Sequence, residues 1–134
     1  RSYADKWGYD LVIADKKREK ANVSEVMNII GDVKGMDVIL VDDMVDTAGT
    51  LVKAAEALKK KGANSVMACC THGVLSGPAY ERIEKGELDE LVISDTIPTR
   101  KNAKKITVLT ASTMIGEAIR RIHNNESVNS IFIA

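Results

Sequence analysis

The sequence lacks several features that would assign it to a familiar class of protein. The 19 basic and 19 acidic residues cancel, so there is no overall positive field of the kind that general binding to nucleic acids or anionic membranes requires. No apolar run approaches the roughly 18 to 20 residues that cross a bilayer, and the first ten residues lack the apolar segment of a signal peptide. We therefore expect a soluble, cytoplasmic protein with neither nucleic acid nor membrane among its partners.

Cysteine and histidine are also scarce, which argues against two kinds of structural cross-link. Cys69 and Cys70 are the only two cysteines, and adjacent residues of an extended strand point to opposite faces, so we expect reduced thiols rather than a disulfide. A structural zinc site needs further ligands at short spacing, but His72 and His123 lie far apart without such partners. We assign no metal ligand to this chain.

What the sequence does contain is a regular alternation of short apolar segments and helical patterns. At 134 residues and 45% hydrophobic content, it is large enough for one ordinary domain but not for two. Strands are expected at residues 11–14, 38–41, 66–70, 91–94, 107–109 and 130–133, and helices at about 50–61, 76–86 and 112–121. This order predicts an α/β fold: three layers, with a mostly parallel sheet and helices on both faces.

The two ends of the chain carry further expectations. Residues 1–6 look like the tail of a helix with no strand before it, whereas a doubly wound domain usually opens on a strand. We therefore expect the chain to start inside a larger protein and to lack the first strand of its domain. Apolar residues at helical spacing in the last helix should face inward; they are Met114, Ile115, Ala118, Ile119 and Ile122.

The most informative stretch is residues 38–51, VILVDDMVDTAGTL. Its apolar run is typical of a buried parallel strand, which would place Asp42 and Asp43 at the carboxyl end, where open α/β sheets bind ligands. Two adjacent carboxylates repel each other, and vicinal hydroxyls or a divalent cation would relieve that repulsion. The acid pair therefore predicts a binding site rather than a core position.

A small turn that opens a helix follows the acids. Its hydroxyls and free backbone N–H groups suit a phosphate dianion. Asp46 or Thr47 could merely cap the helix, but capping explains one of these residues and not the whole set, which includes Gly49 and Thr50. Acids at one end and phosphate donors at the other predict a bound sugar phosphate.

Residues 15–20, DKKREK, form a run of charges after the first expected strand. Such a run is usually a solvated loop. Because we expect it to leave at the same sheet edge as Asp42, Lys16 and Arg18 could close over bound phosphates as a cationic lid. His72 is a weaker candidate for the same site, because no residue near it in the sequence would orient its ring.

These segments resemble a known family. VDDMVDTAGT resembles the ribose 5-phosphate loop that is shared by phosphoribosyltransferases and by ribose-phosphate pyrophosphokinases, also called phosphoribosyl pyrophosphate synthetases. The flanking sequence favours the second group: ADKKREKANVSEVMNIIGDVKG is similar to its flexible catalytic loop and the helix after it, and ACCTHGVLSGPA, SDTIP and EAIRRIHNNESVNSIF also match. The resemblance covers essentially the whole chain. It implies one phosphoribosyltransferase-like domain over residues 1–134, the carboxyl-terminal part of a longer protein, truncated at its amino end.

The resemblance also implies an activity and a set of site residues. This family transfers the diphosphate of ATP to ribose 5-phosphate, with Mg²⁺, and so makes phosphoribosyl pyrophosphate for nucleotide biosynthesis. The implied residues are the catalytic pair Lys16 and Arg18, the ribose-binding acids Asp42 and Asp43, and the phosphate-binding Asp46, Thr47, Ala48, Gly49 and Thr50. The second residue of the family's usual Lys-Arg-Arg is Lys17 here, which keeps the first and third positions.

Other parts of the family's machinery would lie outside this chain. The resemblance places the residues that bind ATP and most ligands of Mg²⁺ upstream of Arg1, so we expect the fragment alone to be inactive and the full-length protein to be a homo-oligomer. Residues 127–130, SVNS, are similar to part of a regulatory phosphate site, but Asn129 stands where a second small hydroxyl residue is frequent.

Two alternative functions stay open at this point. A phosphoribosyltransferase would use the same sugar-phosphate loop, but it would need its own base-recognising segment, and the sequence contains none that we recognise. A non-catalytic regulatory relative could bind nucleotides or partner proteins. Retention of Lys16, Arg18 and the acid pair argues against that relative, because binding alone needs little stabilisation of transition-state charge.

Overall fold

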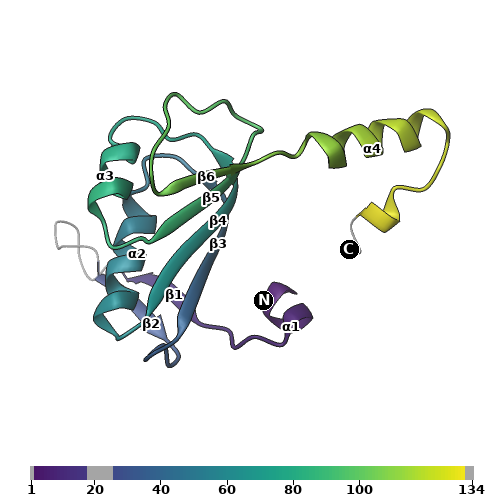
Figure 1. The fold of residues 1–134 in the computed structure, drawn as a ribbon. Coiled ribbons are helices and arrows are strands. Elements are labelled where there is room, and N and C mark those ends of the chain that lie inside the picture. The colour runs from purple at the N-terminus through teal and green to yellow at the C-terminus, as the bar shows by residue number, and fades with distance from the viewer. Residues whose placement is uncertain (1, 18–25, 132–134) are drawn as a thin grey trace.

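The computed structural model describes residues 2–17 and 26–131 as a mixed α/β fold (Figure 1). The elements follow in the order α1 (Ser2–Trp7), β1 (Ile13–Lys17), β2 (Val26–Ile30), β3 (Asp37–Val45), α2 (Gly49–Lys60), β4 (Ser65–Gly73), α3 (Ala79–Lys85), β5 (Glu90–Ser94), β6 (Ile106–Leu109), α4 (Ser112–His123) and the 3-10 helix η1 (Asn129–Ile131). The predicted α/β class is confirmed.

Four of the strands form one parallel sheet in the order β3-β4-β5-β6. Parallel neighbours bring their carboxyl ends to a common edge. The register places Asp42 of β3 beside Cys70 of β4, and Met44 beside His72. The expected strands at 38–41, 66–70, 91–94 and 107–109 all belong to this sheet.

The core lies between this sheet and the two helices α2 and α3, which cover one of its faces (Figure 1). The apolar spacing of α2 buries Val52, Ala54, Ala55 and Leu58. Gly62 ends the helix with a left-handed φ of 93°, a conformation that costs glycine little. The strands contribute the other side of the core, with Val66 and Leu91 both 0% exposed.

The other face of the sheet differs from the expectation. Ile39 and Val41 of β3 are 56% and 53% exposed, and α4 extends away from the sheet (Figure 1). The predicted helix forms, but none of its residues is buried, so the expectation that its apolar face turns inward is wrong for this chain. An amphipathic pattern determines which side chains share a helix face, but it does not determine which surface that face meets.

The beginning of α4 is nevertheless attached to the sheet. Asp95, which follows β5, accepts a hydrogen bond of 2.8 Å from the backbone N–H of Ala111, the residue before α4. This hydrogen bond, followed by one from Thr110, holds the pKa of the Asp95 carboxyl below its usual value. The attachment therefore fixes where α4 starts, while the rest of the helix has no buried side chain.

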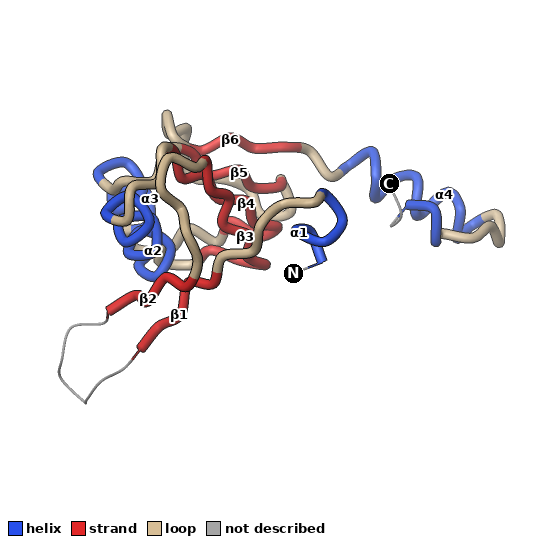
Figure 2. Tube along the Cα trace, turned by 90° about the horizontal axis from the view of Figure 1, so that it is seen from below, coloured by secondary structure: helices blue, strands red, loops and turns tan. Residues whose placement is uncertain are grey.

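Two local predictions are corrected by the structure. The stretch that resembled a helix after the catalytic loop contains strand β2, which pairs antiparallel with β1 in a separate two-stranded sheet (Figure 2). Its β-branched residues favour a strand, and Ile29 is 3% exposed against the core. The strand expected at 130–133 is wrong where described, because Asn129–Ile131 is a 3-10 helix; residues 132–133 lie outside the described part.

The described residues include no helix with the length and apolar character needed to cross a bilayer.

Candidate functional site

The candidate site begins at the carboxyl end of β3. The strand is longer than expected and runs on to Val45, so Asp42 and Asp43 lie inside it rather than just after it. Both acids are exposed. Adjacent strand residues point to opposite faces, so the two carboxylates diverge. The backbone N–H of Asp43 donates to Asp42 Oδ1 at 2.9 Å.

Residues 46–50, which are the three residues after β3 and the first two of α2, form what we call the cradle loop. Ala48, the residue before α2, has a left-handed backbone with φ 59° and ψ 9°, and its carbonyl accepts the helix bond from Val52 N–H at 3.0 Å. The first N–H groups of a helix have no partner within it. The cradle loop therefore presents backbone donors at the positive end of α2.

The start of α2 lacks two features that usually stabilise such a position. No side chain caps the helix at Ala48, and its first turn, which the structure describes completely, contains no acidic residue. Ser, Thr, Asp and Asn caps and acidic first turns are the common solutions, because both satisfy or neutralise the exposed N–H groups. The cradle loop instead leaves these groups available for an anion.

A second loop, residues 74–78 after β4, is joined to the cradle loop by several hydrogen bonds. The backbone N–H groups of Leu75 and Ser76 donate to the carbonyls of Val45 and Asp46, each at 3.1 Å. The Ser76 hydroxyl also donates to the Asp46 carboxylate. The Asp46 side chain is therefore held by a residue 30 positions further along the chain, and the two loops form one unit.

Helix α3 provides the next contact with the cradle loop. Arg82 Nη1 donates to the carbonyl oxygen of Thr47 at 2.9 Å, across 35 residues of sequence. A Cβ added to Gly49 would lie 3.3 Å from the same nitrogen, so this guanidinium lies directly against the glycine. Gly49 thus provides space for Arg82 as well as an unobstructed backbone.

His72 has the orienting partner that its sequence neighbourhood could not supply. Its Nδ1 lies 2.9 Å from Thr96 Oγ1, and Thr96 Oγ1 donates to the carbonyl of Thr71 at 3.1 Å. Ser94 Oγ donates to the same carbonyl at 2.6 Å. These hydroxyls hold the ring at the carboxyl edge of the sheet, in register with Met44 of β3.

The cysteines are poor nucleophiles in this environment. Burial, with the negative charge of Asp42 as the next cause, raises the pKa of the Cys70 thiol to about 11. Burial also raises the pKa of Cys69. Both thiols are free, as expected, and they are protonated at neutral pH.

The charged lid is placed only in part. The backbone of Lys16 lies in β1, opposite Met27 of β2. β1 is not a strand of the parallel sheet, so the expectation that the lid leaves at the same sheet edge as Asp42 is wrong for the described residues. β2 instead contacts the carboxyl end of α2, where Lys61 Nζ donates to the Ile29 carbonyl at 2.5 Å. Arg18 lies outside the described residues.

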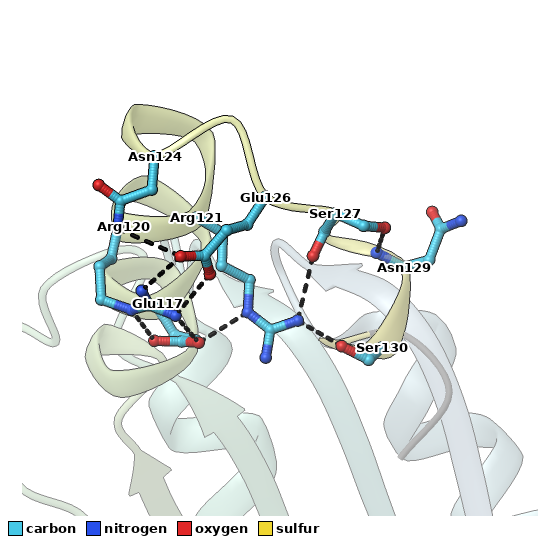
Figure 3. A network of polar contacts seen from close by, with 8 residues as sticks. All are labelled: Glu117, Arg120, Arg121, Asn124, Glu126, Ser127, Asn129 and Ser130. Atoms are coloured by element: carbon cyan, nitrogen blue, oxygen red, sulfur yellow. Dashed lines mark hydrogen bonds and ion pairs between the residues drawn. The ribbon is translucent and has the colours of Figure 1, made fainter.

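The segment that resembled a regulatory phosphate site follows α4, and Figure 3 shows its contacts with that helix. Arg121 donates to the Ser127 carbonyl at 3.1 Å and also to the Ser130 hydroxyl. Its Nε lies 2.6 Å from Glu117, which also pairs with Arg120 at 2.9 Å. The Arg121 guanidinium and the Ser130 hydroxyl are therefore joined by a hydrogen bond.

The described residues do not assemble a metal site: no group of three or more His, Cys, Asp or Glu side chains is placed to hold an ion. Arg82 and Thr96 are the site residues that the sequence did not indicate. Each contacts a partner at least 24 positions away in the chain. No local spacing could have marked them.

Comparison with known proteins gives three findings. Residues 12–133 match the phosphoribosyl synthetase-associated domain family. Proteins named ribose-phosphate pyrophosphokinase from Wolinella succinogenes and Campylobacter jejuni are 66% and 67% identical over 133 residues, which is 99% of this chain and 43% of each relative. A phosphoribosylpyrophosphate synthetase structure from Mycobacterium smegmatis superposes with a TM-score of 0.83 at 35% identity, covering 92% of this chain and 40% of that one.

The chain therefore spans less than half the length of the relatives it matches. A share of length does not place the matched stretch within a longer protein, so the assignment to a carboxyl-terminal part stays a prediction.

Proposed function

This chain belongs to the phosphoribosyl synthetase-associated domain family, and from that premise we propose that it is part of a ribose-phosphate pyrophosphokinase and carries its ribose 5-phosphate site. The full-length protein would transfer the diphosphate of ATP to ribose 5-phosphate and so form phosphoribosyl pyrophosphate for nucleotide biosynthesis. These 134 residues would be its phosphoribosyltransferase-like, carboxyl-terminal domain and would be inactive alone.

The observation that carries this proposal is the cradle loop at the uncapped start of α2. A phosphate dianion accepts several hydrogen bonds, and here the backbone N–H groups of Ala48, Gly49 and Thr50 lie at the positive end of a 12-residue helix. The hydroxyls of Thr47 and Thr50 are exposed beside them. In this proposal the cradle loop binds the 5-phosphate, and Asp46, held by Ser76, fixes its shape.

The acids of β3 take the sugar end of the substrate. Asp42 and Asp43 are exposed and lie within a few residues of the cradle loop. They are therefore near enough to bind the ribose of a substrate whose 5-phosphate occupies that loop. Because adjacent strand side chains diverge, we propose that each carboxylate binds the ribose hydroxyls separately and that the two do not grip the sugar together. Ionised carboxylates accept hydrogen bonds from hydroxyls, so the pairing is chemically matched.

Lys16 and Arg18 are proposed as the catalytic pair. Phosphoryl transfer needs positioning and stabilisation of the charge that spreads over the transferred group, more than a covalent nucleophile. Two cations placed against the transferred group would supply that stabilisation. Their support is the resemblance of ADKKREKANVSEVMNIIGDVKG to the family's catalytic loop, together with the 66% identity of the chain to a named relative.

The family also implies ATP and Mg²⁺. The described residues of this chain do not fit a metal site by themselves, because the two adjacent acids diverge and no third carboxylate or histidine joins them. We therefore place most ligands of Mg²⁺, and the ATP site, in the part of the full-length protein outside these residues. A homo-oligomeric, cytoplasmic enzyme is part of the same proposal.

The test uses the full-length protein. It should form phosphoribosyl pyrophosphate from ATP and ribose 5-phosphate, and calorimetry should detect ribose 5-phosphate binding. Gly49→Val should weaken this binding by at least about tenfold, or 1.4 kcal/mol, because the branched side chain would collide with Arg82 and crowd the cradle loop.

Gly116→Val is the matched control, because a Cβ at Gly116 in α4 would meet nothing within 4 Å. Its affinity for ribose 5-phosphate should equal that of the parent. Unchanged binding in the Gly49→Val protein would remove the phosphate from the cradle loop.

A further inference from the structure

The contact between Arg82 and the cradle loop is not explained by the stability of either helix that it joins. Arg82 Nη1 lies 2.9 Å from the Thr47 carbonyl and 3.3 Å from the position of a Cβ on Gly49, so a cation lies beside the first turn of α2. The amino end of a helix carries partial positive charge and favours anions. A guanidinium at this end is therefore opposed by the helix dipole.

The start of α2 itself supplies no group that relieves that opposition. The first turn of α2 lies wholly within the described residues. It has no acidic residue, and no side chain caps the start of the helix. On α3 the nearby acid Glu81 is paired with Lys85 at 2.7 Å. An anion bound in the cradle loop would neutralise the helix end and the guanidinium together.

The hydrogen bond also fixes the direction of one donor. The peptide that joins Thr47 to Ala48 is planar, so its carbonyl oxygen and its N–H point in opposite directions. Arg82 binds the oxygen, and the N–H of Ala48 must then point away from Arg82. Ala48 is 5% exposed with a left-handed backbone, a conformation that a non-glycine residue adopts only when its surroundings enforce it.

We propose that Arg82 is a positioning residue of the ribose 5-phosphate site, one that orients the Thr47–Ala48 peptide so that the Ala48 N–H faces the 5-phosphate. The inference rests on the proposed function and deepens it. Arg82 comes from α3, which the sequence motif of the cradle loop does not include. Its effect should appear in the affinity for ribose 5-phosphate and not in the affinity for ATP.

The experiment measures steady-state kinetics and calorimetry on the full-length protein, four single variants and one double variant. Arg82→Ala should raise both the KM and the Kd for ribose 5-phosphate by about tenfold or more, in the range expected for a hydrogen bond from a charged donor. The KM for ATP should stay within about twofold. Arg82→Lys keeps the charge without the planar fork, so its loss should be smaller than that of Arg82→Ala.

Lys85→Ala is the matched control on the same helix. Its ammonium group is exposed and pairs with Glu81, so removing it should change neither KM. Gly49→Ala supplies a second route to the same contact, because its Cβ would displace the guanidinium by a few tenths of an ångström. If Gly49→Ala acts through Arg82, adding it to Arg82→Ala should produce no further loss of affinity.

Each outcome has a defined meaning. Equal ribose 5-phosphate affinity in the parent and in Arg82→Ala would overturn the role of Arg82 and leave the proposed function standing. A parallel rise in the KM for ATP, with a lower melting temperature, would assign Arg82 a purely structural role and also overturn the inference. Failure of the parent protein to bind ribose 5-phosphate would instead refute the proposed function.

Discussion

Helices α2 and α4 have the same length, 12 residues, and apolar residues at helical spacing predict both. They differ in how many of their side chains are buried. α2 buries four side chains against the sheet and its amino end forms the candidate site. α4 buries none, and ion pairs with Arg120 and Arg121 accompany its exposed apolar side chains. Periodicity therefore predicts that a helix forms, whereas the contribution of that helix to the stability of the fold depends on the surface it packs against.

The largest expected difference between the helices is in the cost of truncating one side chain in each. Leu58 in α2 is 1% exposed, so Leu58→Ala should lower the free energy of unfolding by about 3 kcal/mol, through lost burial and a cavity. Ile119 in α4 is 63% exposed, so Ile119→Ala should change it by less than about 0.5 kcal/mol. Urea denaturation of the 134-residue chain measures both.

Equal losses of stability in the two variants would contradict this difference between α2 and α4. The same two substitutions should also be made in the full-length protein. A large loss in the free energy of unfolding for Ile119→Ala there would mean that another part of that protein covers α4.

A smaller effect should come from Gly116, inside α4. A Cβ at this position meets nothing within 4 Å, and glycine is about 0.5 to 1 kcal/mol less favourable than alanine inside a helix. Gly116→Ala should therefore increase the helicity of α4, which circular dichroism and chemical shifts can report. Reduced helicity would indicate that Gly116 makes a close contact that alanine prevents.

The smallest effect should be a pH dependence within α4. Hydrogen bonds from Arg120 and then Arg121 lower the pKa of Glu117 from 4.5 to about 2. Because the folded pKa lies below the unfolded one, this contribution to stability is present above about pH 4.5 and is lost as the pH falls toward about 2. Glu126, whose pKa is lowered by Arg120, acts in the same direction.

NMR chemical shifts along α4, recorded through that pH interval, measure the loss. Glu117→Gln should show a weaker pH dependence than the parent, because the amide does not titrate. Buried side chains of α2, such as Leu58, should keep their shifts until the whole domain unfolds. Identical titration of the two helices would contradict the contrast between them.

Much of the fold could be predicted from local patterns. The apolar segments of β3, β4, β5 and β6 and the alternation with helices were sufficient for a parallel α/β sheet, and this class is confirmed. The resemblance to the ribose-phosphate pyrophosphokinase family is confirmed by the matched family and relatives. The resemblance implied a helix where the structure has β2, and the five residues of β2 are too few for periodicity to correct that expectation.

Part of the candidate site could likewise be predicted from local sequence, and part could not. The cradle loop could be identified from its hydroxyls and glycine in sequence, whereas the contact from Arg82 could not, because it crosses 35 residues. The orienting partner of His72 is Thr96, 24 residues away, and was missed for the same reason. The roles of Lys16, Asp42 and the cradle loop in binding and catalysis stay predictions.

The sequence by itself determined the helices, the core strands and the loop whose backbone can receive a phosphate, because these depend on spacing and residue type within about a dozen positions. Only the tertiary structure decided that Ser76 and Arg82 brace this loop, and that α4 stands away from the sheet. The physical reason is that contacts between distant residues depend on strand register and helix packing, which the whole chain sets together.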